Sequence, residues 1–235
     1  MGELDSPFLG SDAVQQGLLT KHQLTLHRRL HRDVYISRGT DLSPLIRAQA
    51  ASTWGGPDGV LAGFSAAAVL GSKWIDDHAP AELIRSGSRR SVPGITVHAD
   101  TLLPGETVIR AGMRITSPAR TAFDLGRWLN HDHAVEVLDA LCAATGLSPD
   151  QILQVIADHP RTRGNKRLRN IIRLLDAGAQ SPPETRTRLS SSGPDSHDRR
   201  PRSKCATAGT MWSPPAISAG RNGARQWSTT ACTIG

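Results

Sequence analysis

Three carboxylates toward the carboxyl end of the chain have the residue type that metal-dependent phosphodiester chemistry would need: Glu184, Asp195 and Asp198. Such chemistry requires several carboxylates that converge on Mg²⁺, which holds the phosphate and activates a water molecule. Glu184 starts a predicted helix, whereas both aspartates lie in a Pro-, Ser- and Arg-rich segment that fixes no geometry. We therefore expect no catalytic residue and no cofactor in the sequence as it stands, and a helix-dipole role for Glu184.

Histidine and cysteine residues do not predict a metal site. None of the candidate histidines stands at a known ligand spacing with cysteines or carboxylates. These histidines are His22, His27, His31, His131 and His133. The cysteines, Cys142, Cys205 and Cys232, are odd in number and contain no CxxC pair, which argues against a disulfide framework and a structural zinc site. We expect reduced thiols and a cytoplasmic protein.

Basic side chains form two candidate DNA-binding sets. Of the formal charge of +7, a net +4 belongs to 190–235, so the remaining chain is only mildly basic. The first set is Lys21, Arg28, Arg29 and Arg32. The second set is expected opposite the apolar stripe of a later helix: Arg161, Arg163, Lys166, Arg167, Asn170 and Arg173. Phosphate contacts require such side chains on one exposed face, and a merely solvated face is the alternative interpretation.

The elements that carry the first set are predicted to be two short helices followed by a short β element. Ser11–Gly17 forms the first helix, Thr20 caps the second, and Val34 and Ile36 alternate in a strand that Gly39 ends. This order is typical of a small winged helix, although little chain remains for a full recognition helix. We assign 1–40 to a degenerate winged-helix-like segment.

The next predicted domain, 41–158, mixes helices and strands. Two helices (44–54 and 65–70) precede four strands (82–85, 94–98, 107–110 and 113–116), the last two joined as a hairpin at Ala111-Gly112. Ser117-Pro118 starts a helix with a buried stripe of Ala119, Ala122 and Phe123. A helix containing Val135 and Leu138 follows, and then one capped by Ser148-Pro149.

The rest of the chain is predicted to be a basic helical connector (159–189) and a disordered tail (190–235). The connector contains a helix from Asn165 to about Asp176 and the start of another at Ser181-Pro-Pro-Glu184. After Leu189 there is no Leu, Val, Phe or Tyr, so the tail cannot bury enough apolar surface to offset the entropy of ordering. No stretch approaches membrane-spanning length, which predicts no membrane association. The fold class is α+β.

The segment Ile115-Thr-Ser-Pro-Ala-Arg-Thr-Ala-Phe-Asp-Leu125 resembles the signature of AbiEi-like antitoxins of type IV toxin–antitoxin systems. In that group a strand–Ser-Pro–helix joint follows an N-terminal winged helix. The resemblance extends from about Phe8 to Asp158. It implies a non-enzymatic DNA-binding or regulatory protein, with a cognate toxin or another protein as a further partner.

A second resemblance begins at Gly164-Asn-Lys-Arg-Leu and continues through Leu174 to Arg186. This segment is similar to the corresponding part of actinobacterial proteins in which a very-short-patch-repair-like endonuclease domain follows an antitoxin-like N-terminal half. In such domains the resemblance implies an acidic residue from each of three motifs. The first is the Glu of a Ser-Pro-x-Glu helix, present here as Glu184. The other two motifs, Asp-Leu-Gly-Trp and Val-Glu-Tyr-Asp-Gly, are absent from this chain.

A shift of the coding frame would account for the missing strings. Degenerate codons for Gln226–Ala231, regrouped one nucleotide earlier, can encode Val-Glu-Tyr-Asp-Gly, and those for Ala216–Gly223 can encode Asp-Leu-Gly-Trp. We therefore hypothesise a one-nucleotide slip near Leu189, which would make the antitoxin-like protein a truncated remnant of a nuclease-like fusion. A native disordered tail is the alternative. In the restored frame the chain would be a Mg²⁺-dependent DNA endonuclease, and a third possibility is a protein-interaction module without DNA binding.

Overall fold

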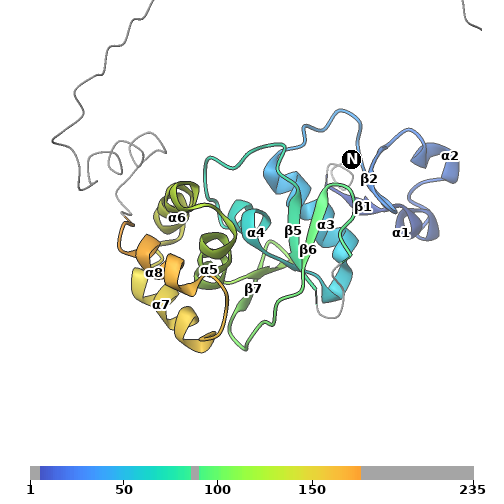
Figure 1. Cartoon of the computed structure of the whole chain (residues 1–235). Helices are drawn as coiled ribbons and strands as arrows, with labels where there is room; N and C mark the ends of the chain where they lie inside the picture. Colours follow the sequence, from blue (N-terminus) through green and yellow to red (C-terminus); the bar gives the residue numbers. More distant parts are fainter. Residues whose placement is uncertain (1–5, 86–89, 176–235) are drawn as a thin grey trace, which may run out of the picture. The chain divides into compact units, whose positions relative to one another are not determined.

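The computed structural model describes residues 6–85 and 90–175, which belong to one compact unit. These residues form a mixed α/β fold with a three-stranded sheet, a five-stranded sheet and a group of helices (Figure 1), as expected for the α+β class. Glu184, the helix predicted from Ser181, and the tail 190–235 lie outside the described residues. Within them, no helix is both long and apolar enough to cross a membrane.

The N-terminal part of the described chain contains two short helices and a small antiparallel sheet. Its elements are β1 (Phe8–Leu9), α1 (Gly10–Gln15), α2 (Lys21–Leu24), β2 (Arg28–His31) and β3 (Val34–Ile36). The strands are ordered β1-β3-β2, and α2 begins with the expected cap, in which Thr20 and Gln23 bond each other's backbone amides. β1 was not predicted from the sequence. The winged-helix character of this segment stays a prediction.

The five-stranded sheet forms the middle of the described chain. Its strands are β4 (Val60–Leu61), β5 (Ala81–Ile84), β6 (Ile95–His98), β7 (Thr107–Arg110) and β8 (Met113–Thr116), in the order β6-β5-β4-β8-β7. β4 pairs parallel with β8 and antiparallel with β5, which pairs parallel with β6. Two helices, α3 (Pro44–Gly55) and α4 (Gly63–Val69), pack alanines against the strands, with a 3-10 turn η1 (Gly56–Asp58) between α3 and β4.

The β7–β8 hairpin turns at the predicted residues. Ala111 and Gly112 have φ of 48° and 74°, and positive φ at both central residues is the mark of a type I′ turn. The pairing runs from Arg110 with Met113 to Thr107 with Thr116. β8 is the only strand beside β7, which therefore lies at the edge of the sheet.

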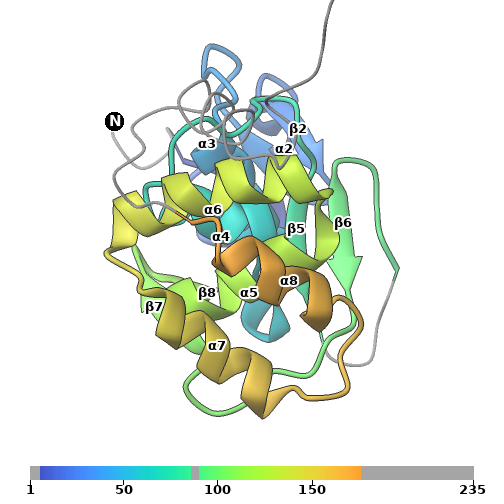
Figure 2. The ribbon, with the colours of Figure 1, turned by 60° about the vertical axis from the view of Figure 1, so that its left-hand side comes forward.

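Four helices follow the sheet and lie together in one group (Figure 2). They share one apolar core. They are α5 (Pro118–Trp128), α6 (His131–Thr145), α7 (Pro149–Asp158) and α8 (Asn165–Ile172). α5 starts as predicted, with Ser117 as its cap and Pro118 in its first turn. α8 ends at Ile172, earlier than the predicted end near Asp176, because a turn follows at Arg173 and Leu174. α5 contacts α6, α7 and α8, so it is the centre of this group.

Candidate nucleic-acid interface

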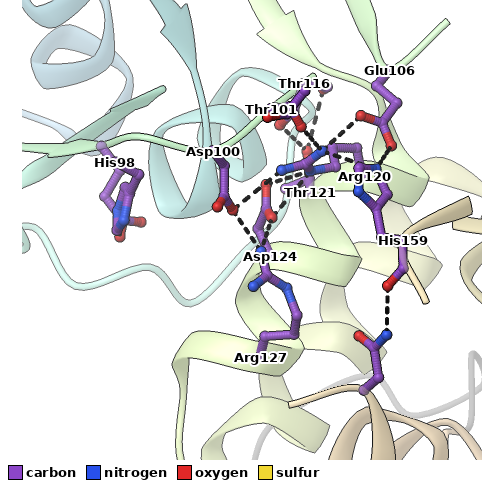
Figure 3. A network of polar contacts seen from close by, with 12 residues as sticks. His98, Asp100, Thr101, Glu106, Thr116, Arg120, Thr121, Asp124, Arg127 and His159 are labelled. Atoms are coloured by element: carbon purple, nitrogen blue, oxygen red, sulfur yellow. Dashed lines mark hydrogen bonds and ion pairs between the residues drawn. The ribbon is translucent and has the colours of Figure 1, made fainter. Parts of the chain in front are cut away.

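The centre of the helical group is charged as well as apolar. Helix α5 contains Arg120, only 1% exposed, and Asp124, which is fully buried. They lie in the segment 115–125 that resembles the antitoxin signature. Burying charge is costly unless each group is paired and hydrogen-bonded. The surroundings of Arg120 meet that requirement (Figure 3).

Arg120 uses all three of its nitrogen atoms. Its Nε donates to both carboxylate oxygens of Asp124 at 3.1 and 3.0 Å, one turn further along α5. Its Nη1 donates to Glu106 Oε2 at 2.6 Å and to the carbonyl oxygen of Thr101 at 2.8 Å. Its Nη2 lies 3.3 Å from Asp100 Oδ2. The guanidinium therefore joins α5 to the 99–106 segment between β6 and β7.

Arg127 completes the same cluster from the end of α5. Its Nη2 donates to Asp100 Oδ2 at 2.7 Å and to Asp124 Oδ1 at 2.8 Å. Its guanidinium also lies 4.3 Å from the centre of the Phe123 ring, within range of a cation–π contact. We call Asp100, Glu106, Arg120, Asp124 and Arg127 the buried ion cluster: three carboxyl groups around two guanidinium groups.

Glu106 connects the buried ion cluster to the connector. Its Oε1 accepts a hydrogen bond from His159 Nε2 at 2.7 Å, and His159 is the residue that directly follows α7. The carbonyl oxygen of His159 in turn accepts from Asn165 Nδ2 at 2.7 Å, at the first residue of α8. Because the Ser117 N–H also donates to the Glu106 carbonyl oxygen at 2.8 Å, one continuous chain of contacts leads from the joint at Ser117 to the start of α8.

Burial and pairing act in opposite directions on the carboxyl groups of the cluster. Burial would raise the pKa of Glu106, but the Leu103 amide, His159 and Arg120 hydrogen-bond the carboxylate and lower its pKa overall. At Asp124, burial raises the pKa, and the guanidinium groups of Arg120 and Arg127 oppose this effect. Of these two carboxyl groups, Glu106 is therefore the one whose ionised form the fold favours.

Helix α8 docks on α5 through a second arginine contact. Arg167 Nη2 donates to the carbonyl oxygens of Arg127 and Gly126, at the end of α5. Gly126 lets Leu168 approach, since a Cβ there would lie 2.4 Å from Leu168 Cδ1. Gly164, with φ of +97°, turns the chain into α8. These contacts fix one face of α8 and leave the other outside.

The outer face of α8 and the turn before it carry an uncompensated positive charge. Segment 159–175 contains six arginines and lysines and no aspartate or glutamate. Five of the six are exposed, and none forms an ion pair with any described residue. We call these five the connector surface: Arg161, Arg163, Lys166, Arg169 and Arg173. Arg161 and Arg163 precede α8 rather than belonging to it, because the helix starts at Asn165.

The other basic set lies on α2 and on the β2–β3 hairpin of the N-terminal part. We call its four exposed residues the hairpin surface: Lys21, Arg28, Arg29 and Arg32. Arg28 and Arg29 stand on β2, an edge strand with an irregular register between Arg29 and His31. His31 contributes little positive charge, because burial and the nearby Arg47 lower its pKa more than the Pro93 carbonyl raises it. None of the four forms an ion pair with a described residue.

The structure distinguishes residues that looked equivalent in the sequence. Arg167 belongs to the predicted DNA-binding set, yet one of its guanidinium nitrogens contacts α5. Arg169 was not in that set, and it is exposed on α8 beside the others. The buried ion cluster was not predicted at all. Its only sequence signal is the polar spacing of Arg120, Asp124 and Arg127 within an otherwise apolar helix.

The described residues of the chain contain no group of three or more histidine, cysteine, aspartate or glutamate side chains placed to hold a metal ion. His131 Nδ1 contacts Asp132, and the His133 ring packs on Phe64, so both have local roles.

Comparison of the chain with protein-family models, with curated proteins and with solved structures gives no match in any of the three. The relationship to AbiEi-like antitoxins therefore remains a prediction from the residues of the 115–125 segment.

Proposed function

We propose that this chain is a non-enzymatic, antitoxin-like regulatory protein that binds the phosphate backbone of duplex DNA. The observation that carries the proposal is the connector surface: five exposed cations without a single acidic residue in 159–175. A protein that neutralises phosphates with such side chains gains affinity by releasing the counterions of DNA. A face that was merely solvated would be expected to mix both signs of charge.

Docking of α8 supports the same proposal. The Arg167 contact with α5 and the buried Leu168 and Ile171 leave the opposite side of the helix to present Lys166, Arg169 and Arg173. Cations on a docked helix need less ordering on binding than cations on a flexible segment. The hairpin surface offers a further four cations, and the resemblance of 115–125 to an antitoxin signature supports a regulatory role.

Phosphate contact explains affinity but not sequence preference. Base readout requires side chains that reach the base edges in a groove, and α2 has only four residues. We therefore expect binding to depend strongly on salt and weakly on DNA sequence.

A salt titration of binding to a labelled duplex tests the proposal. The logarithm of the affinity should fall linearly with the logarithm of salt concentration, with a slope of about −0.9 for each neutralised phosphate. Changing all five residues of the connector surface to alanine should remove about 4.5 units of slope if each contacts a phosphate. Lys73→Ala, which removes an exposed cation outside both basic surfaces, is the matched control and should leave the slope unchanged.

Two outcomes would contradict the proposal. If the wild-type chain shows no binding at low salt, the interaction-module alternative is left. If the five-residue variant binds like the wild type, the connector surface does not contact DNA. A second variant with alanine at all four residues of the hairpin surface, measured in the same titration, shows how much of the remaining salt slope comes from that surface.

A further inference from the structure

The free edge of the five-stranded sheet is the feature that carries a further inference. β7 is the last strand of the sheet, and β8 is its partner on one side only. Among the described residues, no backbone hydrogen bond outside the sheet involves residues 107–110. Ile109, in the middle of β7, is 73% exposed, the highest exposure among the large apolar side chains of the described chain.

The hairpin register determines which backbone groups of β7 face outward. Arg110 and Met113 flank the two-residue type I′ turn, so they form a hydrogen-bonded pair. Hydrogen-bonded and non-hydrogen-bonded pairs alternate along an antiparallel ladder. The Ile109–Arg114 pair is therefore non-hydrogen-bonded, and the N–H and C=O of Ile109 point away from β8, toward the free edge.

We propose that a second copy of this chain pairs with β7 across a twofold axis that passes midway between the two copies of Ile109. Antiparallel pairing centred there places Ile109 opposite its counterpart, so that each Ile109 N–H donates to the other Ile109 C=O. The axis is perpendicular to the sheet, so the two isoleucine side chains emerge on the same face and cover each other. The five-stranded sheet of each copy becomes half of a continuous sheet of ten strands.

Self-complementarity favours a second copy over a peptide from another protein. A twofold interface needs a surface that matches itself, and the outward N–H and C=O of one residue, with an apolar side chain, meet that condition. The same register sets Arg110 opposite Val108 of the other copy, so no two like charges stand directly opposed. Unpaired edge strands generally promote pairing unless charge or proline blocks them. β7 contains no proline, and its single charged residue, Arg110, is the last residue of the strand, beside the turn.

The expected affinity of the dimer follows from the small area that the paired β7 strands bury. Four paired residues on each side bury much less than the roughly 1,200–2,000 Å² of a stable protein interface. The dimer should therefore be weak, and its population should rise with protein concentration. This prediction does not depend on DNA binding and would stand if the proposed function failed.

Sedimentation equilibrium of the full chain without DNA tests the pairing. The average mass should rise from monomer toward dimer as the concentration increases to about 1 mM, where a millimolar dissociation constant still gives a measurable dimer. Ile109→Lys should remove the rise, because it sets two like charges opposite each other. Ile109→Pro should also remove it, because proline has no N–H to donate across the axis. Leu153→Lys, an equivalent change of a partly exposed leucine on α7, should leave it unchanged.

Thermal unfolding of each variant shows whether it is folded. If Ile109→Pro does not fold, the folded Ile109→Lys variant alone tests the pairing. A wild-type chain that stays monomeric over the whole range would overturn the proposal and leave the edge to a different partner. A dimer that survives Ile109→Lys in a folded protein would also overturn it, because the pairing would then lie elsewhere.

Discussion

The buried ion cluster and the connector surface use the same residue type for opposite purposes. Arg120 is nearly inaccessible and each of its nitrogens contacts an acceptor, whereas Arg161, Arg163 and Arg173 are exposed and have no ion-pair partner among the described residues. A net charge calculated from the sequence counts all of them equally. The comparison shows that only the second group is available to a polyanion, while the first holds together the elements on which the second is displayed.

The largest expected effect comes from removing the cation at the centre of the cluster. Arg120→Ala leaves the carboxylates of Asp124 and Glu106 buried without their main partner, which should cost about 3–5 kcal/mol of unfolding free energy. Urea denaturation followed by circular dichroism measures this loss. Arg163→Ala, the same change on the connector surface, should alter stability by less than about 0.5 kcal/mol. Equal losses in the two variants would contradict the division of roles.

A double variant sharpens the same test. Replacing Arg120 by Met together with Asp124 by Leu removes both charges and keeps apolar volume, so it should be less destabilising than Arg120→Ala. If the double variant is the less stable of the two, the cost of Arg120→Ala comes from lost packing rather than from unpaired charge.

The pH dependence of stability isolates Glu106. Its pKa is lowered in the folded chain, so its contribution is fully present above the unfolded value of about 4.3 and is lost as pH falls through the lower folded value. Glu106→Gln cannot lose this contribution, and its stability should fall less steeply below about pH 4. Denaturation of both proteins at several acidic pH values gives the difference. Parallel curves would mean that the pairing with Arg120 and His159 does not favour the carboxylate.

Arg167 lies between the two regions and tests their connection. Arg167→Ala removes the hydrogen bonds to the end of α5 and should cost about 1–2 kcal/mol of unfolding free energy. Arg167→Lys keeps the charge but loses the planar geometry of the guanidinium. If α8 must be docked to bind DNA, both variants should weaken binding. Wild-type affinity in Arg167→Lys would show that charge alone matters at this position.

The smallest change in stability should accompany a clear change in binding. Removing one exposed cation, as in Arg169→Ala, should leave unfolding unaffected and reduce the magnitude of the salt slope by about 0.9. Fluorescence anisotropy with a labelled duplex at several salt concentrations gives that slope. An unchanged slope would exclude Arg169 from the DNA contact.

The local elements of the fold were predictable where a short stretch carries its own signal. Ser117-Pro118 starts α5, Ala111-Gly112 turns the hairpin, and Thr20 caps α2, because capping and turn residues act within three or four positions. β4 was missed because its two residues, Val60 and Leu61, give no period. Its parallel partner β8 begins more than 50 residues later in the chain.

The candidate site was predictable only in part. A basic, acid-free stretch at 159–175 is visible in the sequence, but its exposure depends on which side of α8 is docked. The predicted apolar stripe of α5 includes Ala122 and Phe123, which are buried, but the helix also buries Arg120 and Asp124. An arginine between apolar residues is normally expected to face solvent. Its burial depends on Asp100 and Glu106, which lie on a distant segment that no helical period can locate.

The brevity of α8 has a consequence for any attempt to study the connector as a synthetic peptide. An isolated helix of eight residues is not stable in water, and only docking on α5 gives these residues a fixed shape. A peptide of 159–175 would keep every positive charge but would sample many conformers, so binding would first have to order it. Its amide protons should exchange with solvent almost freely, whereas those of the same helix in the whole chain should exchange only when it detaches from α5.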